Sequence, residues 1–338
     1  MAFIPESFRD QPYAAKRFRR IVEAARQYND FYRGWLAEDD AVPIVSRDVF
    51  TRNNALILGD TPPTGRTSGS TGIPVQIAKS HTRAAMDSAD QDLLIRWLGG
   101  RLSCSHITHP ATNPPPEWMM DVTATIDEQI QFIQHRYQSR QAVALTTYPT
   151  NAEFLAREIV DRGVDMTFIQ RVGVYAEALE SAQEVLIRQA FPNAQFWTTY
   201  SSIEFGMIAI RCPWDPRFHH WMDHKLGIEV LREDGSPCRI GEIGRVVITD
   251  YFNTLSPLIR YELGDLAARG ECRCGRTNLP AFSEVIGKVR GALLKRSGQR
   301  VIFTNCRSLC ETSRGCVSIR SSKIRSRISP FRTLLLAI

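Results

Sequence analysis

The order of apolar and amphipathic segments between residues 142 and 200 constrains the fold of this chain more than any other feature. Strands are expected over 142–148, 166–175 and 195–200, and the helices between them end near residues 163 and 190. This alternation predicts parallel strands covered by helices. We expect Thr150-x-x-Glu153, which follows Pro149, to open the first of these helices as a capping box.

A second region, after residue 226, has the pattern of antiparallel strands. The apolar runs over 228–233 and 244–249 flank a turn at Asp234-Gly235, which predicts a β-hairpin or meander. The expected fold class is therefore α/β. It combines parallel sheets flanked by helices with a smaller, mainly antiparallel β sub-domain.

Residues 67–75 read TSGSTGIPV and form the most distinctive short motif. Glycines permit unusual backbone angles, so such a loop can direct several N–H groups and hydroxyls toward one anion. Phosphate is the anion that such a loop usually binds. The motif is not a Walker A loop, because no Gly-Lys-Ser/Thr follows at the required spacing. The alternative interpretation of the motif is a Ser/Gly-rich surface linker. The candidate phosphate ligands are Thr67, Ser68, Gly69, Ser70, Thr71 and Gly72.

This motif resembles the phosphate loop of the adenylate-forming superfamily, which includes the acyl-CoA synthetases, and especially its phenylacetate–CoA ligase and CapK-like branch. The resemblance runs from about residue 18 to about residue 303. It implies an ATP- and acid-binding N-terminal domain over 1–287, which is the large domain of an adenylate-forming enzyme, and a hinge remnant over 288–303. Val75 stands where many members have a lysine.

Two further segments extend the resemblance. Residues 200–204 read YSSIE, where the superfamily has Tyr-Gly-x-Thr-Glu, and 260–265 read RYELGD, where it has Arg-Tyr-x-x-Gly-Asp. The resemblance implies that Tyr200 and the adjacent Ser201 contact the nucleotide, that Glu204 holds Mg²⁺, and that Asp265 binds the ribose hydroxyls. Glu204 and Thr71 are the candidate catalytic residues. Without this context Glu204 would be a charge at a helix start and Asp265 a plain turn residue.

Two positions match the family less closely. Ala176-Glu177 stands where the family has a Gly-Glu pair at the acid pocket, and Glu177 is a candidate ligand there. Lys288 lies in a segment similar to the family hinge and is expected to orient the nucleotide. Arg290 and Gly291 stand where an aspartate is usual.

A Cys/His set suggests a metal site. Cys212, His219, Cys272 and Cys274 supply three thiolates and an imidazole, which is a ligand set for a closed, structural zinc. The spacing is not that of a common zinc finger, although some members of the resembled branch place zinc in corresponding segments. His220 competes with His219 as the fourth ligand. The alternative is unrelated reduced cysteines beside a surface histidine pair.

The net charge of +6 comes entirely from the last 35 residues. Residues 304–338 contain seven Lys/Arg and one acid, while residues 1–303 contain 35 basic and 35 acidic residues. We expect this basic tail to be poorly ordered, because it lacks an apolar pattern. It has no aromatic interleaving, so no nucleic-acid partner is expected. The lysine that the family carries in its C-terminal lid is not found.

These observations predict an AMP-forming acid–thiol ligase. ATP, Mg²⁺ and a structural Zn²⁺ are the expected cofactors, CoA or another thiol is the acceptor, and an aryl acid is the favoured substrate. The alternative is a truncated, catalytically impaired relative that binds nucleotide or acid, or partners a complete ligase. No signal peptide or membrane span is evident, so a cytoplasmic protein is expected. A homodimer is expected from the resembled branch.

Overall fold

The structure is a computed structural model. It describes residues 4–8, 11–36, 42–67, 74–110, 112, 114–288, 292–294 and 300–302. The expectations for residues 68–72 and for the tail over 304–338 lie outside this part of the chain. Among the described helices, none has the length and apolar character that crossing a membrane requires.

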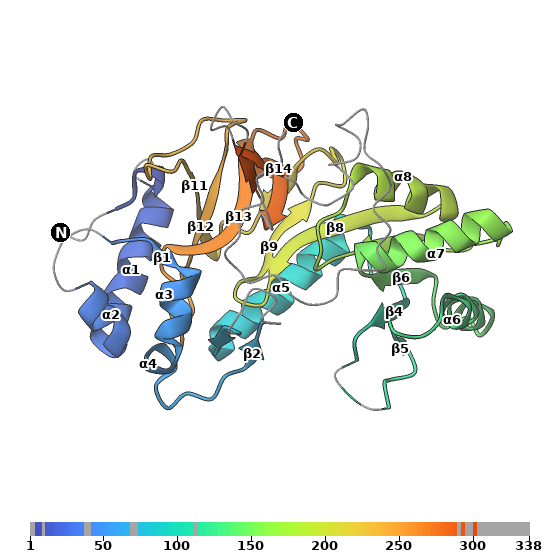
Figure 1. The fold of residues 1–338 in the computed structure, drawn as a ribbon, viewed down its shortest axis with the longest axis horizontal. Helices are drawn as coiled ribbons and strands as arrows, with labels where there is room; N and C mark the ends of the chain where they lie inside the picture. The colour runs from blue at the N-terminus through green and yellow to red at the C-terminus, as the bar shows by residue number, and fades with distance from the viewer. Residues whose placement is uncertain are drawn as a thin grey trace.

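One twelve-stranded sheet runs through the molecule (Figure 1). The pairs among β4 to β8 are parallel, and those that lead from β8 to β11 are antiparallel. In pairing order the strands are β11 (Leu226–Leu231), β12 (Ile243–Asp250), β13 (Tyr261–Gly270), β14 (Ala281–Lys288), β10 (His219–Trp221), β9 (Gly206–Arg211), β8 (Gln195–Ser202), β7 (Arg171–Val174), β6 (Ala144–Thr147), β4 (Cys104–Thr108) and β5 (Met119–Asp121), and β1 (Val45–Ser46) pairs with β13. The predicted α/β fold is confirmed, with its antiparallel part continuing the parallel sheet.

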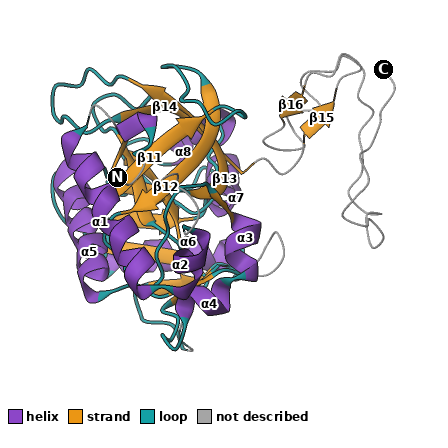
Figure 2. Ribbon diagram, turned by 90° about the vertical axis from the view of Figure 1, so that its left-hand side faces the viewer, coloured by secondary structure: helices purple, strands orange, loops and turns teal. Residues whose placement is uncertain are grey.

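Helices cover both ends of this sheet. The N-terminal ones gather at one end of the molecule and α6 to α8 at the other (Figure 1). Figure 2 looks onto the N-terminal end and shows β11, β12 and β14 above α2 to α4. The elements are η1 (Glu6–Phe8), α1 (Pro12–Tyr28), α2 (Asp30–Trp35), α3 (Arg47–Arg52), α4 (Asn54–Leu58), α5 (His81–Trp97), α6 (Ile126–Gln138), α7 (Pro149–Arg162) and α8 (Ser181–Ala190), with the two-stranded sheets β2 (Gly65–Arg66)/β3 (Gln76–Ile77) and β15 (Ala292–Leu294)/β16 (Arg300–Ile302).

Three apolar clusters hold the layers together. The first joins α1 to α4 to the antiparallel strands, the second joins α6 to α8 to the parallel strands, and the third joins α5 to β9. The buried side chains of α1 recur at three- and four-residue steps, which gives that helix one apolar face. The helix α1 thus buries an apolar stripe against the sheet, whereas α5 also buries the charged side chains of Arg83 and Asp90.

The predicted capping box on α7 is wrong. The helix begins at Pro149, whose fixed φ suits the first helical position. The Thr150 backbone N–H and hydroxyl both donate to Glu177 Oε2, at 3.0 and 2.7 Å, so this hydroxyl does not cap the helix locally. Glu153 instead accepts a hydrogen bond from Arg157, at 3.0 Å.

Two cations are fully buried at the junction of α5 with the sheet. Arg83 on α5 donates to the backbone carbonyl of Phe205 (2.5 Å), and Lys225 donates to the same oxygen (3.3 Å). Phe205 directly follows Glu204 in the turn between β8 and β9. These two side chains therefore fix the backbone beside a candidate site residue.

Carboxylates from α5 and β12 compensate these buried charges. Arg83 pairs with Asp250 (2.5 Å) and Asp87 (2.6 Å), and Lys225 pairs with Asp87 (2.9 Å) and Asp90 (2.5 Å). Burial alone would raise the pKa of Asp87, but Lys225 and Arg83 lower it to about 2. The network is charged, and each member depends on the others, because an unpaired buried charge is strongly unfavourable.

We expect Lys225→Met to lower the free energy of unfolding by about 3–5 kcal/mol, because it removes the buried cation that pairs with both Asp90 and Asp87. Urea denaturation measures this change. Lys16→Met, on the exposed side of α1, is the control and should change stability by no more than about 0.5 kcal/mol. Equal effects of the two substitutions would show that the network does not stabilise the fold.

Candidate active site and Cys/His cluster

A large cavity of about 1800 Å³ lies along the parallel strands and extends past their carboxyl ends. Its lining includes every predicted nucleotide or acid ligand whose side chain is described: Thr67, Glu177, Tyr200, Ser201, Glu204 and Asp265. Ligand sites in sheets of this kind lie at the carboxyl ends of the strands. The structure therefore brings these residues, which are far apart in sequence, to one site.

The base of the predicted phosphate loop is closed by strand-like hydrogen bonds. The Thr67 N–H donates to the Val75 carbonyl (2.9 Å), and the Val75 N–H donates to the Thr67 hydroxyl (2.9 Å). These bonds continue the β2/β3 pair into the loop. Ser68, Gly69, Ser70, Thr71 and Gly72 lie outside the described residues, and their phosphate-binding role stays a prediction.

Glu204 is a deeply buried carboxylate on the cavity wall, with 3% of its surface exposed. Its Oε1 accepts a hydrogen bond from Arg47 (2.7 Å) and a longer one from the Tyr261 hydroxyl (3.4 Å). The second guanidinium nitrogen of Arg47 donates to the Thr67 hydroxyl (3.0 Å). One side chain thus joins the carboxylate to the base of the loop.

Asp265 and Tyr200 meet at the same end of the cavity. The Tyr200 hydroxyl donates to Asp265 Oδ2 (2.6 Å), and the ring of Tyr200 contacts Phe282 edge-on, with 6.1 Å between ring centroids. Burial, and then the Asp265 carboxylate, raise the pKa of Tyr200 well above its usual value, so the hydroxyl keeps its proton. Lys288 lies opposite Asp265 in the β13/β14 ladder, and its side chain is outside the described set.

Glu177 is held by the helix that follows β6. Its Oε2 accepts both hydrogen bonds from Thr150, and an anion at the first turn of α7 also suits the helix dipole. The preceding residue, Ala176, has φ of +69°, a left-handed conformation that favours glycine. Ala176 stands where the resembled family has the glycine of its Gly-Glu pair, and the backbone at this position still has the conformation that favours glycine.

Two residues at or beside the cavity, Arg47 and Trp197, were not found by sequence reasoning. Nothing in the sequence around Arg47 marks it as a site residue, and its partner Glu204 lies 157 positions further along the chain. No local pattern connects the two. Trp197 is a second case: it lines the cavity, and a Cβ added at Gly173 would approach its ring to 2.2 Å. The indole thus lies directly on β7, where only a glycine allows it.

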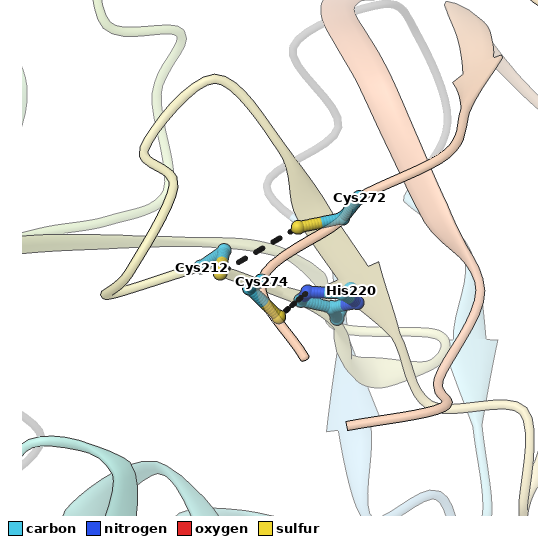
Figure 3. A group of neighbouring side chains, drawn as sticks. All are labelled: Cys212, His220, Cys272 and Cys274. Carbon is cyan, nitrogen blue, oxygen red and sulfur yellow. Dashed lines mark hydrogen bonds between the residues drawn. The ribbon is translucent and has the colours of Figure 1, made fainter. Parts of the chain in front are cut away.

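The structure brings together the three cysteines of the predicted Cys/His set, but with a different histidine. Cys212, His220, Cys272 and Cys274 bring their ligand atoms within 4.8 Å of one another, so His220 replaces the predicted His219 (Figure 3). Neighbouring residues on a strand point to opposite faces, and both histidines lie on β10. His219 lines the cavity instead, and burial lowers its pKa to about 4.

The geometry of the cluster fits a tetrahedral metal ion. With Zn–S bonds of about 2.3 Å and Zn–N bonds of about 2.0 Å, tetrahedral ligands lie about 3.8 Å (S···S) and about 3.5 Å (S···N) apart. The observed separations are 3.8 Å between the sulfurs of Cys212 and Cys272, and 3.7 Å between Cys274 Sγ and His220 Nε2. His220 Nδ1 lies 2.8 Å from the Leu279 carbonyl, which orients Nε2 toward the sulfurs.

Comparison with known proteins identifies the fold. No protein-family model matches the chain. A stretch of 80 residues is 34% identical to phenylacetate-coenzyme A ligase of Thermus thermophilus, and covers 23% of this chain and 18% of that ligase. The resemblance to phenylacetate–CoA ligases seen in the sequence is therefore confirmed over this short stretch.

Solved structures of 2-hydroxyisobutyryl-CoA ligase share the fold over most of this chain. One, in an open conformation with 2-HIB-AMP and CoA, has a TM-score of 0.70 at 16% identity, over 89% of this chain and 79% of that one. Another, in the thioesterification state with the same ligands, has a TM-score of 0.65 at 17% identity, over 86% and 70%. The chain has the fold of an adenylate-forming CoA ligase.

We expect Ala176→Gly to raise the free energy of unfolding by about 0.5–1 kcal/mol, because it relieves the left-handed strain beside Glu177. Chemical denaturation measures the change. Ala178→Gly is the matched control in the same segment, since Ala178 has no positive φ, and it should give no gain. Stabilisation by Ala178→Gly but not by Ala176→Gly would contradict the assignment of strain.

Proposed function

We propose that this protein is an AMP-forming carboxylic acid ligase that resembles phenylacetate–CoA ligase. A substrate carboxylate oxygen attacks the α-phosphorus of ATP, the bond to the β-phosphate oxygen breaks, and acyl-AMP and pyrophosphate form. A thiolate then attacks the acyl carbon and releases AMP, which leaves a thioester. The observation that carries this proposal is the single cavity that joins Thr67, Glu204 and Asp265.

The nucleotide end of the cavity has the chemistry that this reaction needs. The loop that starts at Thr67 would hold the phosphates, and Glu204 would bind Mg²⁺, which prefers carboxylate and phosphate oxygens. Asp265 would accept hydrogen bonds from the two ribose hydroxyls. The hydrogen bond between Asp265 and Tyr200 supports a role for the tyrosine ring beside the adenine, and Lys288 would orient the nucleotide from the neighbouring strand.

One part of the cavity wall is apolar, and we propose that the acid binds there. Trp197 lies on β7, and Leu94, Leu98 and Met207 line the cavity beside it. An indole face and aliphatic side chains suit an aromatic ring, which can stack and bury its surface there. We therefore propose an aryl acid as the substrate. CoA is proposed as the thiol acceptor, in line with the fold likeness to a CoA ligase.

Pyrophosphate exchange into ATP tests the activity directly. With Mg²⁺ and a panel of aryl and aliphatic acids, the proposal expects exchange that depends on an aryl acid. ATP binding without exchange would instead favour the alternative, a nucleotide-binding relative that does not adenylate. If no acid supports exchange and ATP does not bind, the proposed function is wrong.

We expect Asp265→Ala to weaken ATP binding by about 10- to 100-fold in calorimetry, since hydrogen bonds to a charged group contribute about 1.5–3 kcal/mol. Asp161→Ala, on the exposed side of α7, is the matched control and should leave the affinity unchanged. An unaltered affinity in Asp265→Ala would remove the ribose assignment.

We also propose that Cys212, His220, Cys272 and Cys274 bind a structural Zn²⁺. None of the four lines the cavity, and four protein ligands leave no open position for catalysis. When bound, the metal would cross-link the segment after β9, strand β10 and the segment after β13.

Zinc content distinguishes the two histidines. We expect His220→Ala to lose the metal and His219→Ala to retain it, measured by mass spectrometry of the purified protein. The reason is that only the His220 ring faces the three sulfurs. The reverse pattern, or a wild-type protein that binds no zinc even after reconstitution, would contradict the assignment.

A further inference from the structure

Arg47 makes side-chain contacts that a packing role does not explain. Its guanidinium donates to Glu204 Oε1 through one terminal nitrogen and to the Thr67 hydroxyl through the other, at 2.7 and 3.0 Å. Both acceptors line the cavity. Arg47 is the first residue of α3, which is capped by Ser46 and ends at the exposed Arg52.

The ion pair with Glu204 is mostly shielded from water. The side chains of Arg47 and Glu204 are 19% and 3% exposed. A carboxylate buried to this extent requires a partner, and the Tyr261 hydroxyl supplies only a long second contact to the same oxygen. Since both of these donors engage Oε1, a metal ion would bind through Oε2.

The shape of the guanidinium matters as much as its charge. Its planar fork reaches two acceptors at a fixed separation, whereas an ammonium group is a single point of charge. One acceptor is the candidate magnesium ligand, and the other begins the predicted phosphate loop. Because both acceptors bond to the same rigid guanidinium, a shift of Glu204 also shifts the Thr67 hydroxyl.

We propose that Arg47 is a positioning residue for the metal-bound nucleotide. It orients the Glu204 carboxylate toward Mg²⁺ and sets its distance from the loop base at Thr67, so that one ion and one polyphosphate are bound together. This inference rests on the proposed function, in which Glu204 holds the metal. Hydrogen-bond partners of metal ligands commonly change metal affinity by about 10- to 100-fold when removed.

The test measures ATP affinity by calorimetry twice for each protein, with Mg²⁺ and with EDTA. The ratio of the two affinities is the metal enhancement. We expect Arg47→Met to lower this enhancement by about tenfold, and to change metal-free ATP binding by less than about twofold. Arg47→Lys keeps the charge but not the fork, and should recover only part of the enhancement.

Two further variants complete the experiment. Glu204→Gln should abolish most of the enhancement, and Arg52→Met, on the exposed side of the same helix, should leave it unchanged. Thermal unfolding of each variant verifies that the protein is folded. If Arg47→Met does not fold, the Arg47→Lys result alone decides between a partial loss and none.

The outcomes separate this inference from the proposed function. Equal weakening of ATP binding with and without Mg²⁺ in Arg47→Met would show that Arg47 does not act through the metal, and would overturn the inference. An unchanged enhancement in Arg47→Met beside a lost one in Glu204→Gln would also overturn it, with the proposed function intact. Absence of ATP binding in the wild type would instead remove the proposed function itself.

Discussion

The structure depends on hydrogen bonds from two buried cations to one backbone carbonyl, that of Phe205. Arg83 and Lys225 both donate to Phe205 O, and neither cation reaches water. Their desolvation is offset only because Asp87 and other carboxylates pair with them at short distances. Since Arg83 belongs to α5, this network connects that helix to the residue next to Glu204 through the interior. The turn that carries Glu204 thereby acquires a fixed position.

The sheet supplies the second constraint. Strand β8 pairs in parallel with β7 and antiparallel with β9, so it joins the two halves of the fold. Tyr200 and Glu204 follow from this strand and its turn, and Asp265 comes from β13 beyond the join. Residues separated by more than sixty positions, as Tyr200 and Asp265 are, therefore meet with a 2.6 Å hydrogen bond. The large cavity lies where the parallel strands end.

Sequence reasoning recovered the parts of the site that carry a local signature. Tyr200, Glu204 and Asp265 stand in short motifs of recognisable composition, and the structure places all three on the cavity. Sequence reasoning failed where the role of a residue depends on partners that lie far away in the sequence. His219 points away from the three sulfurs because it neighbours His220 on the same strand, and a tertiary hydrogen bond from Thr150 to Glu177 replaces the capping box. Arg47 is the same kind of case, because only the folded chain brings it to Glu204. The loop roles, the homodimer and the basic tail stay predictions.

The measurement that tests the central claim most directly is a crystal structure with Mn²⁺ in place of Mg²⁺ and the non-cleavable analogue α,β-methylene-ATP. The account predicts an anomalous manganese peak at bonding distance from the Glu204 carboxylate. It also predicts ribose hydroxyls on Asp265 and phosphates at the loop that begins at Thr67. A nucleotide bound elsewhere in the cavity, or manganese remote from Glu204, would contradict the account.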